Sequence, residues 1–168
     1  MSNLITISQE MNYLANNMVE IGILGEDKDR KSDDPKKRTT ILEYAVYNEF
    51  GTSKIPARPF MRTAIEENKE FIRKTVDKCL EKILQGRMTG ENALKIIGET
   101  VRGHIIETIK KANRWAKPLD SKTLKAKLKR GSNNNKILLE DRFLIRAIRY
   151  KITDKRGSIK FISDFKEV

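Results

Sequence analysis

The sequence predicts an α+β domain in which a small antiparallel β-sheet packs against two long antiparallel α-helices, with extended polar loops. Apolar residues recur at intervals of three, four and seven over residues 60–84 and again over residues 90–112, which predicts the two helices. Apolar and polar residues alternate over residues 19–24, 147–152 and 158–162, which predicts the strands of the sheet.

The N-terminal part of the chain predicts a helix, a strand and a loop in that order. Residues 5–18 have the spacing of a short amphipathic helix, and residues 19–24 are rich in β-branched side chains. Residues 25–40 have almost no apolar content and cannot drive burial, so we expect a solvated, mobile loop. Its acidic residues do not fit a calcium site, because basic residues alternate with them and the mid-loop glycine is absent.

The two long helices are predicted together with their ends. Gly86 interrupts the apolar stripe of residues 60–84, and Thr89 is a suitable cap for the helix over residues 90–112. A connection this short joins antiparallel neighbours. Cys79 lies on the first apolar stripe and is predicted to be a core residue. As the single cysteine in the sequence, it excludes an intramolecular disulfide.

The C-terminal part predicts a second loop and a hairpin. Residues 113–136 are basic and polar, so we expect another mobile segment, in which three leucines have the spacing of a short helix capped by Asp120 or Ser121. The last two predicted strands form a hairpin over residues 147–162, with Gly157 supplying the turn. The length of the chain suits one domain over residues 1–168.

Charge is the outstanding feature of the composition. The net charge is +12, and it is unevenly placed: residues 1–60 hold 8 basic and 9 acidic side chains, whereas residues 61–168 hold 27 and 14. Such a balance suits nucleic acid, an anionic membrane surface or an acidic protein, and it does not choose among them. The sequence shows neither a long apolar run nor a signal-peptide pattern, so we expect no membrane span and a cytoplasmic site of synthesis.

No convincing catalytic constellation is present, and we predict no enzymatic activity, no cofactor and no metal. His104 is the single histidine, and its place beside an apolar stripe favours a partly buried surface position over a catalytic role. A nucleophile elbow of the Gly-x-Ser-x-Gly kind is missing. The string Gly51-Thr-Ser-Lys54 does not make a phosphate-binding loop, because no glycine-rich segment precedes it.

The segment over residues 43–60 predicts a helix, a rigid elbow and the start of a second helix. Its helical part contains four apolar residues at helical spacing, Leu42, Ala45, Val46 and Phe50. Thr40-x-x-Glu43 has the form of a capping box, and Gly51 ends the helix. Pro56 and Pro59 then restrict the backbone, and Pro59 also suits the first turn of a helix.

The elbow also carries a recognisable pattern. It contains the strings Ala45-x-x-x-Glu49-Phe50-Gly51-Thr52 and Ile55-Pro56-Ala57-Arg58-Pro59-Phe60-Met61-Arg62, followed by a helix with Glu67-Asn68-Lys69. This pattern resembles the signature of tailed-phage neck and tail-completion proteins, which are virion proteins also found in phage-derived tail particles. Residues 138–148 keep the apolar frame of a second family motif, with Asp141-Arg142 in place of a Thr-Gly pair.

The resemblance implies a structural protein of a virion or phage-tail-like particle, assembled in the cytoplasm of a host bacterium. It implies a ring that completes the head-proximal end of the tail, with six copies to fit a tail of six-fold symmetry. The partners implied are the tail tube or tail terminator and the head connector. The candidate residues for subunit interfaces are Glu43, Glu49, Phe50, Arg58, Phe60 and Arg62, with the arginines pairing with Glu43 or Glu49 of a neighbour. The alternative is that the elbow only joins two helices of one subunit.

The basic segment offers a second set of candidates: Lys122, Lys125, Lys127, Lys129 and Arg130. They either contact DNA phosphates or an acidic partner, or they solvate a loop, and the sequence favours the two readings equally. Trp115 is the single aromatic residue of the segment, which argues against base stacking on single strands. The rival function is therefore a small basic protein that binds nucleic acid without sequence readout.

Overall fold

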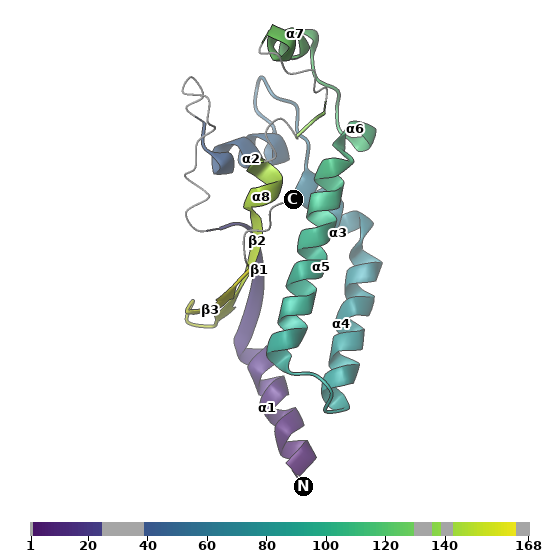
Figure 1. Ribbon diagram of the computed structural model, residues 1–168, viewed down its shortest axis with the longest axis vertical. Coiled ribbons are helices and arrows are strands. Elements are labelled where there is room, and N and C mark those ends of the chain that lie inside the picture. The colour runs from purple at the N-terminus through teal and green to yellow at the C-terminus, as the bar shows by residue number, and fades with distance from the viewer. Residues whose placement is uncertain (1, 25–38, 130–135, 139–142, 164–168) are drawn as a thin grey trace.

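The computed structural model describes residues 2–24, 39–129, 136–138 and 143–163 (Figure 1). Along these residues the elements are α1 (Ser2–Asn16), β1 (Asn17–Ile23), α2 (Ile41–Phe50), α3 (Phe60–Glu67), α4 (Lys69–Leu84), α5 (Gly90–Lys110), α6 (Ala112–Trp115), α7 (Ser121–Lys129), α8 (Phe143–Ala147), β2 (Ile148–Asp154) and β3 (Ile159–Ile162). The predicted α+β class is confirmed.

The three strands form one antiparallel sheet with β2 between β1 and β3. β1 pairs with β2 from Asn17 opposite Asp154 to Ile23 opposite Ile148. The predicted hairpin is confirmed, because β2 and β3 are joined by a turn in which Gly157 has φ 82°. The sheet therefore pairs a strand near the start of the sequence with one more than 120 residues later.

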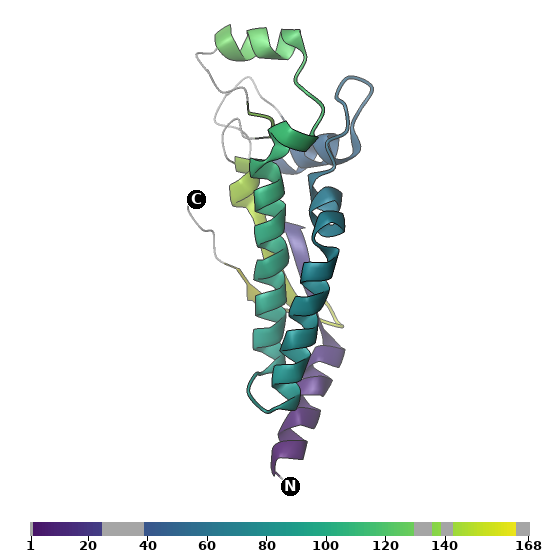
Figure 2. The same ribbon diagram turned by 90° about the vertical axis from the view of Figure 1, so that its right-hand side faces the viewer.

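Helix α5 is the central element of the fold. It packs against the sheet through β1 and β2 and against α3, α4 and α1 on its other sides, as Figure 2 also shows. Its buried apolar side chains include Val101, Ile105 and Ile109, which join Phe60 and Ile148 in the main core. Gly98 faces the ring of Tyr150, and a Cβ at this position would lie 2.4 Å from the ring. The missing side chain therefore lets β2 approach α5.

The prediction of one continuous helix over residues 60–84 is wrong, because the structure has two helices there, α3 and α4, which meet at Asn68. Asn68 has φ −111° and ψ 11°, and its side-chain amide donates to the carbonyl oxygen of Ala64 at 2.9 Å. This bond from side chain to backbone competes with the helical pattern. The connection to α5 is as predicted, because Thr89 Oγ1 accepts a hydrogen bond from Asn92 N at 3.2 Å.

The body is elongated, with the N-terminal end of α1 at one end and α7 at the other (Figures 1 and 2). The basic segment over residues 113–136 contains α6 and α7 in its described part, and α7 confirms the short helix expected there. Asp120 is its cap, since Asp120 Oδ1 accepts from Thr123 N at 2.6 Å. Most of the loop predicted over residues 25–40 lies outside the described residues.

Candidate functional site

The elbow begins with α2, whose two ends are fixed as the sequence predicts. At the start, Thr40 Oγ1 accepts from Glu43 N at 3.2 Å while Glu43 Oε2 accepts from Thr40 N at 2.8 Å, so the capping box is present. At the end, Gly51 has φ 77° and ψ 174° and donates its N–H to Tyr47 O at 3.0 Å. Only glycine readily adopts this backbone conformation. The helix therefore stops at a defined residue.

Short-range hydrogen bonds close the turn that follows. Thr52 Oγ1 accepts from the backbone nitrogens of Lys54 and Ile55 at 3.2 and 3.0 Å, and Thr52 N donates to Ile55 O at 2.8 Å. The backbone N–H of Arg58 donates to the carbonyl oxygen of Asn48, which ties the exit of the turn to α2. The elbow is therefore held by hydrogen bonds between residues of its own segment and α2.

Glu49 joins α2 to the start of α3. Its two carboxylate oxygens accept from Met61 N at 2.9 Å and from Arg62 N at 3.1 Å. Pro59 precedes the first helical residue and provides no side-chain cap, so Glu49 supplies the acceptor from twelve residues upstream. A carboxylate at a helix N-terminus also interacts favourably with the helix dipole.

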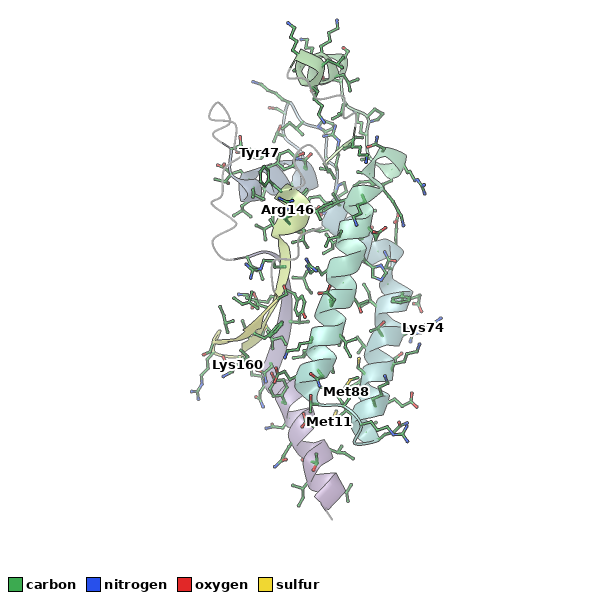
Figure 3. All side chains as sticks on the ribbon, viewed as in Figure 1. Met11, Tyr47, Lys74, Met88, Arg146 and Lys160 are labelled. Atoms are coloured by element: carbon green, nitrogen blue, oxygen red, sulfur yellow. The ribbon has the colours of Figure 1, made fainter. Side chains whose placement is uncertain are left out.

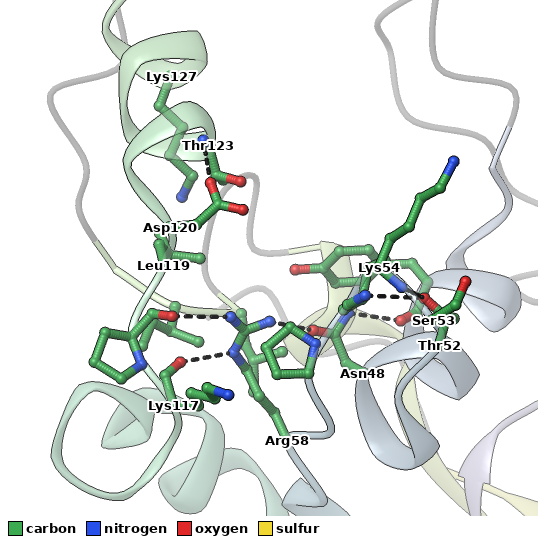
Figure 4. Close-up of a pocket in the computed structure, with 16 residues that line it drawn as sticks. Asn48, Thr52, Ser53, Lys54, Arg58, Lys117, Leu119, Asp120, Thr123 and Lys127 are labelled. Atoms are coloured by element: carbon green, nitrogen blue, oxygen red, sulfur yellow. Dashed lines mark hydrogen bonds between the residues drawn. The ribbon is translucent and has the colours of Figure 1, made fainter.

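Two of the predicted interface residues lie inside their own subunit. Phe60 is 0% exposed and belongs to the main core. Arg58 is 6% exposed, and its Nε donates to Lys117 O at 3.0 Å (Figure 4). Its terminal nitrogens make longer bonds, from Nη1 to Asn48 Oδ1 at 3.4 Å and from Nη2 to Pro118 O at 3.5 Å. For these two residues the structure fits the alternative in which the elbow joins segments of one chain.

Of the four apolar residues whose spacing predicts helix α2, only Ala45 is buried. Ile41, Ala45 and Asn48 are buried. Five large hydrophobic side chains of α2 are exposed, namely Leu42, Tyr44, Val46, Tyr47 and Phe50. We call four of them, Leu42, Val46, Tyr47 and Phe50, the α2 apolar surface. Phe50 is the most exposed of them, at 67%. Glu43 and Arg62 are exposed as well, so these two predicted interface residues and Phe50 lie on the outside of the subunit.

The basic candidates of α7 divide into two groups. Lys122, Lys125 and Lys129 are exposed at the end of the molecule where α7 lies. Lys127 is 6% exposed, and its Nζ donates to Lys136 O at 3.1 Å. Lys127 was expected to face DNA or an acidic partner, and the structure corrects this, because its ammonium group binds a backbone oxygen of the same subunit. Arg130 lies outside the described residues.

A cavity of about 550 Å³ separates the elbow from α7 and from the segment that precedes it (Figure 4). Its lining includes the cationic residues Lys54, Arg58, Lys117 and Lys127 and one carboxylate, Asp120. The backbone N–H of Thr123 donates to this carboxylate and lowers its pKa below the ordinary value. Burial lowers the pKa of Arg58, with Tyr44 and Asp120 acting in the opposite direction. Sequence patterns do not reveal this cavity, because its walls come from segments about sixty residues apart.

The residues considered for chemistry lie elsewhere. His104 packs edge-on against Phe71 with ring centroids 5.2 Å apart, and its Nε2 is buried without a hydrogen-bond partner among the described residues. Cys79 is buried beside Ile83 and Ala93, and burial raises the pKa of its thiol. Within the described part of the chain, no cluster of three or more histidine, cysteine or carboxylate side chains is arranged to hold a metal ion.

None of the described helices combines the length and apolar character needed to cross a membrane. Comparisons of the chain with protein-family models, with curated proteins and with solved structures find no match. The features that offer a functional argument are the elbow, the α2 apolar surface and the cavity below α7.

Proposed function

We propose that this protein is a structural component of a virion or phage-tail-like particle, and that its copies form a ring at the head-proximal end of the tail. In this role it completes the tail and joins it to the head connector. The observation that carries the proposal is the α2 apolar surface, held beside an elbow whose residues resemble those of tail-completion proteins. The mechanism is assembly, with no chemical turnover.

The α2 apolar surface has the chemistry of a protein contact. Leu42, Val46 and Phe50 follow one another at intervals of four residues, so they form one stripe along the helix, with Tyr47 beside it. A group of exposed apolar side chains rimmed by polar residues commonly marks an interaction site. Burying this stripe against a different surface of the next copy would give a head-to-tail contact, which closes into a ring when the rotation permits.

The elbow supplies the rigidity that such a contact requires. The capping box at Thr40, the turn at Thr52 and the carboxylate of Glu49 fix α2 relative to α3 before any partner binds. A surface that is already ordered loses less conformational entropy on binding. The copy number of six, and the tail and head-connector proteins as neighbours of the ring, are inferred from the sequence resemblance.

A second candidate function is favoured by the charge. Lys122, Lys125 and Lys129 are exposed on α7, and the chain has a net charge of +12. A cationic end of this kind can bind DNA phosphates without reading sequence, with an affinity that falls steeply as salt is added. The function would then be that of a small basic nucleic-acid-binding protein.

Light scattering distinguishes the two functions. The mass of the purified protein is measured alone, with isolated tail tubes from the same source, and with duplex DNA at two salt concentrations. The proposal predicts a subunit that becomes a ring on the tube end. A subunit that ignores the tubes but binds DNA with a steep salt dependence would contradict it and favour the second candidate.

A further inference from the structure

The floor of the cavity below α7 holds a buried guanidinium, that of Arg58, which forms no salt bridge among the described residues. The carboxylate of Asp120 lines the same cavity and acts on this charge without a direct contact. Arg58 is 6% exposed, and the acceptors of its three hydrogen bonds are neutral oxygens. Burying a charge costs free energy that neutral acceptors only partly offset, so the site is incomplete electrostatically.

The guanidinium group of Arg58 also has N–H donors that make no hydrogen bond to the described residues. Each terminal nitrogen carries a pair of hydrogens and makes one bond, at 3.4 Å for Nη1 and 3.5 Å for Nη2. Both distances exceed the usual N–H···O range of about 2.7–3.2 Å, so these two bonds are weak, whereas the Nε bond at 3.0 Å is of ordinary length. Donors on both terminal nitrogens therefore remain for an acceptor with two oxygens, the arrangement that guanidinium groups match best.

The remaining walls favour an anion with an aliphatic stem. Lys54 and Lys117 are exposed residues of the cavity lining and add positive charge to that of Arg58. Asp120 is the opposing charge, and its carboxylate is already bound to the backbone N–H of Thr123 at 2.6 Å. The same lining includes five apolar residues: Ile55, Pro56, Leu119, Ile137 and Leu138.

We propose that this cavity is a binding site for the carboxylate of an acidic peptide segment, with Arg58 as the residue that anchors it. A glutamate side chain fits the lining, because its carboxylate can pair with the guanidinium while its methylene groups contact the apolar wall. The cavity volume of about 550 Å³ lies within the range of ordinary ligand sites. The inference goes beyond ring formation and holds for a single copy of the chain.

The test uses the full chain labelled with nitrogen-15 and follows the side-chain Nε–H resonance of Arg58 by NMR. The probe is the blocked peptide acetyl-Gly-Glu-Gly-amide, and the matched neutral probe is acetyl-Gly-Gln-Gly-amide. A third titration with inorganic phosphate distinguishes a carboxylate site from a general oxyanion site. All titrations are made at one ionic strength, because exposed lysines attract any anion weakly.

The expected result is a saturable shift of the Arg58 resonance with the glutamate peptide and binding at least tenfold weaker for the glutamine peptide. Lys54→Gln should weaken glutamate binding several-fold, whereas Lys74→Gln should not change it. Lys74 is exposed on α4 and away from the cavity (Figure 3), so its loss removes the same charge without touching the site. Arg58→Lys should abolish binding in a protein that still gives a folded spectrum.

Three outcomes would overturn the proposal. The first is equal binding of the glutamate and glutamine peptides. The second is the same loss of affinity for Lys54→Gln and Lys74→Gln, which would show attraction by net charge alone. The third is binding of phosphate without binding of the glutamate peptide. Because every arm uses the isolated chain without tail tubes, failure here leaves the proposed ring function separately testable.

Discussion

Replacing Gly51 by alanine tests whether the elbow depends on one backbone conformation. Gly51 ends α2 with φ 77° and ψ 174°, a region that residues with a side chain rarely adopt. A Cβ at this position would lie 2.9 Å from Ala57 N and 3.1 Å from Ile55 O. Both contacts are with backbone atoms of the turn, so rotation of a side chain cannot relieve them.

The expected loss of stability for Gly51→Ala is about 1–3 kcal/mol from the backbone conformation alone. With a urea m-value of about 2 kcal/mol/M, a loss of about 2 kcal/mol lowers the unfolding midpoint by about 1 M. The assay is urea unfolding of the isolated chain followed by circular dichroism.

Gly103→Ala is the matched control. Gly103 lies within α5, and a Cβ there would have no heavy atom within 4 Å. The same substitution should therefore stabilise the protein by up to about 1 kcal/mol, because alanine is a better helix former than glycine. Equal midpoints for the two variants, or a higher midpoint for Gly51→Ala than for the parent chain, would refute the role assigned to the turn.

The other two stability predictions concern the core and the hairpin. Phe60→Ala should lower the free energy of unfolding by about 3–5 kcal/mol, because it empties a wholly buried site. Ile159→Ala is the control, since Ile159 is exposed and its loss should change stability by less than about 0.5 kcal/mol. Thermal unfolding of both variants tests this difference. The backbone N–H of Ser158 donates to the carboxylate of Asp154 and lowers its pKa below the ordinary 3.8. The ionised carboxylate therefore stabilises the fold at pH values above 3.8. This contribution to the free energy of unfolding is lost as the pH falls through the lower pKa of the folded state. The difference in unfolding free energy between the parent chain and Asp154→Asn should therefore be present at neutral pH and shrink in acid, and a pH-independent difference would contradict it.

Local sequence signals predicted the ends of the elements well. Thr40 with Glu43, Thr89 and Asp120 all cap the helices that their side-chain chemistry suggested. Gly157 lies in the hairpin turn with positive φ, as expected. These features depend on residues three or four positions apart, so the sequence contains everything needed to infer them.

Features that depend on tertiary packing were harder to predict. The spacing of Leu42, Ala45, Val46 and Phe50 predicts a helix but does not say which of its faces meets the core. In the structure Ile41 and Ala45 face inward, and the other three of these residues are exposed. At Asn68, where α3 ends and α4 begins, the side-chain amide donates to the carbonyl oxygen of Ala64. The apolar stripe of the sequence continues across this position and does not indicate the division.

The candidate site shows the same limit for charged residues. In the sequence, Arg58 and Lys127 look like cations on the surface of a basic protein. In the structure, each donates to a backbone carbonyl oxygen of a different segment, that of Lys117 and that of Lys136 respectively. Nothing local to either residue indicates those acceptors. Glu49 is similar, since its partners Met61 and Arg62 are reached only after the elbow has turned.

The central claim, that the α2 apolar surface mediates assembly, is tested most directly by the mass of Phe50→Ser with isolated tail tubes. Ile159→Ser is the control, because Ile159 is also an exposed apolar residue but lies on the hairpin. Loss of a central apolar contact costs about 1–3 kcal/mol at an interface, and a ring multiplies this over every contact. If the α2 apolar surface mediates assembly, the parent chain and Ile159→Ser form rings, whereas Phe50→Ser stays a folded monomer. Rings of Phe50→Ser at the parent concentration would contradict it.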